Sequence, residues 1–151
     1  LHVHDTDFVQ FLFGKPKSVF SSGFSKVSGA IDHVLTQYEV DCGAKVSAEG
    51  SWAMTPGWGF NMSYRCIFER ATADYDLGRE KEPLRLFEEG KEKQVIECEG
   101  ADGYVSEMAH LVECVRLGQA PSVSAADGLS AVEICTAEEK SAQTGQIVPV
   151  A

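Results

Sequence analysis

Segments in which apolar and polar residues alternate fill the middle of this chain, and they constrain its fold more than any other feature. In the clearest of them, residues 60–69 read Phe-Asn-Met-Ser-Tyr-Arg-Cys-Ile-Phe-Glu. A period of two residues is typical of a strand with one buried face. The same reasoning predicts further strands at Ser18–Ser25, His33–Val40, Lys45–Trp52, Thr72–Tyr75, Leu84–Phe87 and Val95–Cys98.

Helical patterns occur only before and after these strands. The first runs through Phe8, Phe11 and Leu12, which recur at steps of three and four residues before Gly14. A second helix is expected after Asp102, which can cap it, and it ends at Gly118. Its apolar face combines Tyr104, Met108, Leu111, Val112 and Val115.

A third helix is predicted to begin at Ser124, where Asp127 completes an approximate capping box, and to end at Gly145. A short edge strand at Ile147–Val150 then carries Pro149 at the rim of the sheet. Grouping the elements predicts an α+β fold, in which a large, mostly antiparallel, open-faced sheet has its helices packed on one face. The other face is either solvated or a rather polar subunit interface; its predicted members are Ser47, Glu49, Ser51, Asn61, Ser63 and Arg65.

Length and composition exclude several classes of protein. The 151 residues suit one domain, so we treat 1–151 as a single domain. A formal charge of -10 without a basic cluster argues against a nucleic-acid surface. No apolar run approaches the roughly 18 residues of a membrane span. The five cysteines, an odd number without Cys-x-x-Cys spacing, are expected to be reduced core residues of a cytoplasmic protein; they are Cys42, Cys66, Cys98, Cys114 and Cys135.

The groups best suited to proton chemistry at neutral pH lie in the opening stretch His-Val-His-Asp-Thr-Asp of residues 2–7. In a strand, His2 and His4 would share a face and could bind a metal, as in barrel amidohydrolases. We favour a helix and no metal, because the following periodicity is helical and such a barrel needs about 200 residues or more. In a helix, His4 lies beside Asp7 one turn later. Either the two only hydrogen-bond at a helix start, or His4 takes part in catalysis.

Three motifs in order resemble the C-terminal domain of the glucose-fructose oxidoreductase, inositol dehydrogenase and MocA family. The first is His4-Asp5-Thr6-Asp7 leading to Phe13-Gly14, similar to the family's His-x-x-Asp and Leu-Gly pattern. The second covers Phe60–Tyr75, and the third is the Lys-Ser-Ala-Gln-Thr-Gly segment of Lys140–Gly145, which resembles the family's Ser-Ala-Arg-Thr-Gly ending.

The resemblance implies a two-domain oxidoreductase in which an N-terminal Rossmann domain binds NAD or NADP. The sheet domain would close the pocket for a small sugar or polyol and form the interface of a homo-oligomer. The family's catalytic histidine falls on His4. Asp7, one helical turn later, is a candidate to orient it and to contact the substrate. The family's aspartate would fall just before Leu1, and its catalytic lysine belongs to the other domain. Since the chain contains no Gly-x-Gly-x-x-Gly, we expect the Rossmann domain to be absent from it and this fragment to be inactive alone.

Two further residues are secondary candidates for contacts in the substrate pocket. Trp58 lies between Gly57 and Gly59, where a large aromatic ring is either a packing plug or a wall for a ligand. We favour the plug. His2 is the other candidate, although it is better suited to a helix flank.

Two alternatives to a dehydrogenase remain on the sequence. The domain could serve as an oligomerisation and scaffolding module in a relative that has lost activity. Relatives in the family also cleave glycosides by transient oxidation, which keeps the cofactor but changes the reaction.

Overall fold

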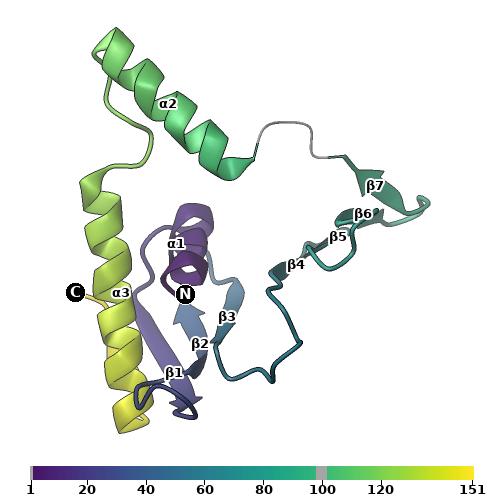
Figure 1. The fold of residues 1–151 in the computed structure, drawn as a ribbon. Helices are drawn as coiled ribbons and strands as arrows, with labels where there is room; N and C mark the ends of the chain where they lie inside the picture. Colours follow the sequence, from purple (N-terminus) through teal and green to yellow (C-terminus); the bar gives the residue numbers. More distant parts are fainter. Residues whose placement is uncertain (1, 98–101) are drawn as a thin grey trace. The chain divides into compact units, whose positions relative to one another are not determined.

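The chain forms two compact units in the computed structural model, which describes residues 2–97 and 102–151. One unit combines the residues up to Thr55 with Gly118–Ala151, and the other is Pro56–Leu117. Along these described residues the elements are one helix, seven strands, two helices and a final strand (Figure 1). This is the order that the sequence patterns predict, and it confirms the α+β class.

The first unit contains a four-stranded antiparallel sheet in the order β3-β2-β1-β8. Residues Val19 of β1 and Tyr38 of β2 are directly opposed, as are Ser21 and Thr36. The short β8 pairs with β1 alone and carries Pro149 at the edge, as predicted. The strands are β1 (Ser18–Phe24), β2 (His33–Glu39), β3 (Lys45–Ser51) and β8 (Val148–Pro149).

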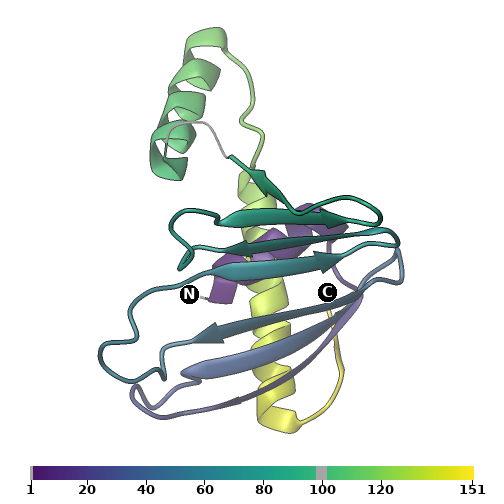
Figure 2. The same cartoon turned by 90° about the vertical axis from the view of Figure 1, so that its right-hand side faces the viewer.

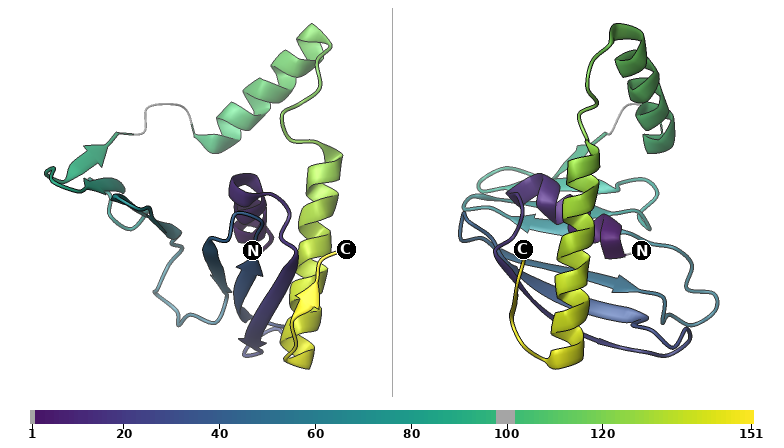
Figure 3. Two further views of the ribbon diagram at one scale, coloured as in Figure 1. Left: turned by 180° about the vertical axis from the view of Figure 1, so that it is seen from behind. Right: turned by 90° about the vertical axis from the view of Figure 1, so that its left-hand side faces the viewer.

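Two helices, α1 (His2–Phe13) and α3 (Ala125–Thr144), pack on this sheet. Figure 3 shows α3 running beside β1 and α1 lying against α3. Ile134 of α3 is fully buried at the centre of the layer between helices and sheet. The buried apolar cluster is Val9, Val19, Tyr38, Val40, Ile134, Ala137 and Val148.

The ends of these helices follow from local residues. Gly14 adopts a left-handed φ of 76° just after α1, and its N–H donates to the carbonyl of Gln10 at 2.8 Å. At the start of α3, Ser124 and Asp127 form the predicted capping box, and Gly145 closes the helix with φ 67°. Left-handed backbone favours glycine because it lacks a Cβ.

The second unit holds another four-stranded antiparallel sheet, β4-β5-β6-β7 (Figure 2), and the helix α2 (Gly103–Leu117). Asp102 caps α2 by accepting the N–H of Tyr104 at 2.9 Å, as predicted. The predicted apolar face of α2 is exposed, from 47% at Leu111 to 80% at Tyr104. The strands are β4 (Ser63–Ile67), β5 (Ala71–Asp76), β6 (Leu84–Glu88) and β7 (Gln94–Ile96).

The strands thus belong to two sheets, where the sequence patterns predict one large sheet. The breaker-rich segment between Ser51 and Ser63, with Pro56 and two positive-φ glycines, contains no strand. It therefore separates β3 from β4. Since α2 belongs to the second unit, the helices packed on the first sheet are α1 and α3.

The expectation that the cysteines are core residues is partly wrong. Cys114 is buried and Cys66 and Cys135 are half-buried, but Cys42 is exposed because it sits in the turn after β2. All four are free thiols, and Cys98 lies outside the described residues. Among the helices of the described residues, none is both long and apolar enough to cross a membrane.

Candidate functional site

Helix α1 carries the candidate residues on two opposite sides. The side turned to α3 and the sheet contains Thr6, which is fully buried, and Val9, which is 6% exposed. The outer side contains His4, Phe8 and Phe11, all exposed. Since residues three or four positions apart share a helix face, His4 lies on an outer surface that is largely apolar.

His4 and Asp7 do not form the hydrogen bond considered from the sequence; in the described part of the chain His4 has none. The half-buried Asp7 instead accepts a long hydrogen bond of 3.4 Å from Gln10 Nε2. The same amide nitrogen donates to the carbonyl of Asp127 at the start of α3, at 3.2 Å. Asp7 is thus directed towards Gln10, and the imidazole of His4 is left accessible.

His2 lies on the inner side of α1, not on its flank as the sequence analysis expects. Its side chain is 14% exposed. The ring nitrogen Nδ1 lies 3.3 Å from Asp5, and Nε2 lies 3.4 Å from the Thr36 hydroxyl and 3.5 Å from Glu138 Oε2. The ring rests over Gly50 of β3, where an added Cβ would come within 2.8 Å of Nδ1. Position 50 therefore requires glycine, because the His2 ring approaches the β3 backbone too closely for a side chain to fit there.

A buried carboxylate, Glu138 of α3, stands at the centre of this inner side. Glu138 is 3% exposed, and the Thr6 hydroxyl donates to its two oxygens at 3.0 and 3.2 Å. The Tyr38 hydroxyl lies 3.4 Å from the Thr6 oxygen, to which it can donate. The hydroxyl oxygen of Thr36 in turn lies 2.8 Å from the hydroxyl oxygen of Ser21. These hydrogen bonds offset the cost of burying the polar groups.

The low-polarity surroundings shift the acidity of two neighbours of Glu138. Burial raises the pKa of the Tyr38 phenol far above its usual value, and the Glu138 carboxylate raises it further. Burial, and after it Glu138, raises the pKa of the Cys135 thiol to about 11. Both groups therefore remain protonated at neutral pH, and neither is suited to act as a base or a nucleophile there.

Trp58 lies in the second unit and its side chain is 64% exposed. Its neighbours Gly57 and Gly59 have φ of 92° and 80°, so the indole projects from a tight loop. The favoured interpretation of Trp58 as a packing plug is therefore wrong for the chain described here. We therefore keep Trp58 only as a proposed contact for a ligand.

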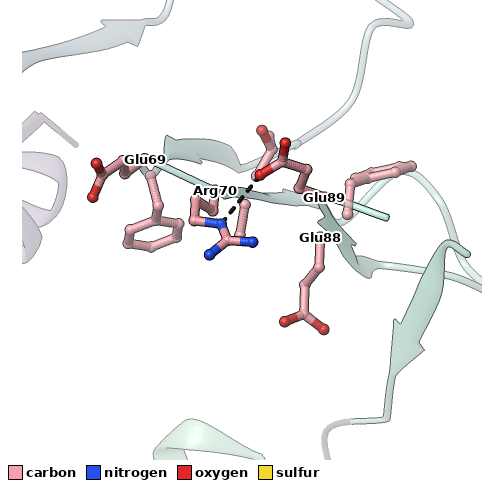
Figure 4. Close-up of a pocket in the computed structure, with 8 residues that line it drawn as sticks. Glu69, Arg70, Glu88 and Glu89 are labelled. Carbon is pink, nitrogen blue, oxygen red and sulfur yellow. Dashed lines mark hydrogen bonds and ion pairs between the residues drawn. The ribbon is translucent and has the colours of Figure 1, made fainter. Parts of the chain in front are cut away.

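The charged side chains that line an open depression on the second unit do not converge on a common point. Figure 4 shows that Glu69 and Glu88 point in different directions, while Arg70 pairs with Glu89 at 3.1 Å. Glu88 is also occupied by Lys91 and Gln94. Lining residues are Phe68, Glu69, Arg70, Ala71, Thr72, Phe87, Glu88 and Glu89.

The buried polar network of Thr6, Thr36, Tyr38 and Glu138 is not predicted by the sequence patterns. One signal could have found the first of them, because Thr6 follows His2 by four residues and precedes Val9 by three, which marks a shared helix face. No local signal connects Thr6 with Glu138, which lies 132 positions later. Within residues 2–97 and 102–151, no group of three or more His, Cys, Asp or Glu side chains could hold a metal ion.

Comparison with known proteins identifies relatives of this architecture. Residues 1–74 match the GFO/IDH/MocA C-terminal domain. The chain is 25% identical over 156 residues to scyllo-inositol 2-dehydrogenase (NAD(+)) of Bacillus subtilis (strain 168), covering 97% of this chain and 45% of that protein.

Solved structures share the fold. A levoglucosan dehydrogenase in complex with NADH superposes with a TM-score of 0.87 at 16% identity, covering all of this chain and 49% of that one. The WlbA dehydrogenase of Bordetella pertussis, in complex with NADH and UDP-GlcNAcA, gives a TM-score of 0.75 at 19% identity, covering 99% of this chain and 43% of that one.

The chain spans about half the length of the relatives that it matches. Its agreement with the solved structures extends over both units, while the family match lies in α1 to β5. The resemblance predicted from the motifs is therefore confirmed by the match of residues 1–74 to the GFO/IDH/MocA C-terminal domain.

Proposed function

We propose that this chain is the substrate-binding and oligomerisation domain of a dehydrogenase that uses NAD or NADP to oxidise a sugar, an inositol or a related polyol. The observation that carries the proposal is the position of His4. It is an accessible imidazole on the exposed, largely apolar side of a helix whose other side is fixed by buried contacts. The curated relative is an NAD(+)-dependent inositol dehydrogenase, which supports the same class of reaction.

The proposed chemistry needs one proton acceptor from this chain. Oxidising a secondary alcohol removes a hydride from carbon and a proton from the hydroxyl group, and a bound nicotinamide supplies the hydride acceptor. His4 then accepts the hydroxyl proton or orients the hydroxyl group. Histidine is the side chain best suited to proton transfer near neutral pH, and a positioned acid or base is worth about 10²–10⁴ in rate.

The sequence of this chain lacks the motif that binds a dinucleotide. The phosphates of such cofactors bind at a glycine-rich turn between a strand and a helix, and no such motif occurs in the sequence. The proposal therefore assigns the cofactor to a Rossmann domain that precedes this chain in the full protein. The exposed side of α1, with Phe8 at 40%, Phe11 at 78% and Leu12 at 45%, would be covered by that domain. This fragment alone is proposed to be inactive.

The open face of the first sheet is proposed to join copies of the protein into a homo-oligomer. On this face Phe24 stacks on His33 with ring centroids 4.9 Å apart and is 51% exposed, and Leu35 is 41% exposed. Ser47 and Glu49, predicted on the same face, are exposed as well. Apolar residues within a polar surround are typical of subunit interfaces. Leu35→Glu should lower the molar mass of the full-length protein measured by light scattering, and an unchanged mass would exclude this face.

The activity is tested with the full-length protein and a panel of sugars, inositols and glycosides. Formation of reduced nicotinamide from a polyol supports the dehydrogenase. Glycoside cleavage without net reduction of the cofactor indicates the glycoside-cleaving reaction instead, and no turnover of any member contradicts the proposal in favour of a scaffold.

The role of His4 is tested on the substrate found. His4→Ala should reduce kcat by about 10²–10⁴. The matched control is His110→Ala, which removes an exposed imidazole from α2 in the second unit and should leave kcat within a few-fold. If His4→Ala behaves like this control, His4 is not the proton acceptor.

A further inference from the structure

Glu138 is a buried carboxylate with an unusual set of partners. It is 3% exposed, yet in the part of the chain that the structure describes no lysine or arginine lies within 4.0 Å of its oxygens. The one basic side chain that reaches it there is His2, whose Nε2 is 3.5 Å from Oε2. Removing a carboxylate from water without a partner is strongly unfavourable. Glu138 therefore depends on His2 and on the hydroxyl of Thr6.

His2 is in turn surrounded by acceptors. Nδ1 faces Asp5 at 3.3 Å, and Nε2 faces Glu138 together with the hydroxyl oxygens of Thr36 and Tyr38. The two ring nitrogens thus face acceptor groups on opposite sides of the imidazole, Asp5 on one side and Glu138 on the other. Gly50 leaves the room that the ring occupies against β3.

These contacts hold the first turn of α1 against α3 and the first sheet. His2 and Thr6 are one helical turn apart, and both bind Glu138. Through Thr36 and Gly50, the same turn is tied to β2 and β3. His4 stands between His2 and Thr6 in sequence and projects from the opposite side of the helix. A rotation or shift of the first turn would therefore displace His4 directly.

We propose that His2 and Glu138 are positioning residues, which act as one unit through Thr6 to fix the orientation of the α1 turn that carries His4. This proposal rests on the proposed function of His4. Neither residue touches the substrate; both set the geometry of the group that does.

The polar nature of the pair favours positioning over simple stability. Replacing a buried ion pair with apolar residues of similar volume is often neutral or stabilising, so packing alone gives no reason for a carboxylate here. Hydrogen bonds define a direction that an apolar contact does not, and a displacement of about 1 Å can cost about 10²-fold in rate. The contacts of His2 and Thr6 with Glu138 are therefore expected to affect kcat, because they orient the turn of α1 that carries His4.

The test uses the full-length protein with Glu138→Gln, His2→Ala and the double variant. Glu138→Gln keeps the shape and an acceptor oxygen for Thr6 but removes the charge. Its matched control is Glu139→Gln, since Glu139 is the exposed neighbour on the same helix. We measure kcat, KM for the alcohol and the nicotinamide, and the hydrogen exchange of the amides of residues 4–7.

Each single variant should lower kcat by about 10- to 100-fold while KM for the nicotinamide stays within a few-fold, and exchange at residues 4–7 should accelerate. The double variant should lose little more than either single variant, because residues that act as a unit are not additive. Glu139→Gln should resemble the parent in every measurement.

Two results would overturn the positioning role. One is a lower melting temperature with unchanged kcat, which shows that the pair is structural only. The other is fully additive losses in the double variant. If Glu138→Gln fails to fold, His2→Ala decides the question alone by the same kcat and exchange criteria. If His4→Ala itself leaves kcat unchanged, the proposed function fails first, whereas loss of kcat in His4→Ala but not in these variants refutes only the positioning.

Discussion

The inner side of helix α1 is more polar than that of an ordinary surface helix, and its outer side is more apolar. Its buried side carries His2 and Thr6 against the Glu138 carboxylate, while its outer side exposes Phe8 and Phe11. A surface helix normally turns apolar residues to the core and polar residues to water. This difference fits the proposed positioning role of the inner contacts, and the outer side is suited to being covered by another surface.

The largest effect on stability should come from removing the hydrogen bonds between the inner side of α1 and Glu138. Thr6→Val keeps the shape of the side chain but removes the donor that bonds to both oxygens of Glu138. Losing a hydrogen bond to a buried charged group costs about 1.5–3 kcal/mol, so the free energy of unfolding should fall by an amount of that order. Denaturant titration measures it. The inner side would be ordinary packing if Thr6→Val were as stable as the parent.

The inner side also predicts a loss of stability in alkali. The pKa values of Tyr38 and Cys135 are raised in the folded state, so above their ordinary values of about 10 and 8.5 the unfolded chain binds fewer protons. Stability is therefore complete below these values and decreases as the pH rises through the folded ones. Melting curves at increasing pH measure the slope.

Removing the ionisable groups should reduce this alkaline slope. Tyr38→Phe keeps the ring in the core and Cys135→Ala removes the half-buried thiol. The double variant should show a flatter dependence of melting temperature on pH above about 9, although its stability at neutral pH is lower. An unchanged slope would mean that the inner side of α1 stays open to water.

The smallest effect on stability is expected on the outer side. Phe11→Ser changes a side chain that is 78% exposed, and surface substitutions of this kind usually lie within about 0.5 kcal/mol. Thermal unfolding of this chain should hardly change. In the full-length protein the same variant should weaken activity by loosening the cover on α1, and a full-length activity equal to the parent would show that no surface packs there.

The order of the elements could be predicted from the sequence because it depends on local patterns. The alternation in residues 60–69 marks β4, although the strand is shorter, at Ser63–Ile67. The capping box at Ser124 and Gly145 place α3 almost to the residue. Such signals act within a few residues of one another, so no knowledge of the tertiary fold is needed to find them.

The partners of the inner side could not be predicted in this way. Thr6 and Glu138 meet across 132 positions, and Gly50 is explained only by the ring of His2 above it. The division into two sheets depends likewise on how the segment before β4 leaves the first sheet. The local sequence favours a packing plug at Trp58, because it does not show that the indole lies exposed between two glycines of positive φ.

The most direct test of the account is a structure of the full-length protein with its nicotinamide and a bound polyol. The account predicts that a ring nitrogen of His4 lies within hydrogen-bond reach, roughly 2.6–3.2 Å, of the hydroxyl oxygen on the carbon that faces the nicotinamide. His2 and Glu138 should keep their contact behind it. An imidazole of His4 directed to bulk water, with another group at that hydroxyl, would contradict the account.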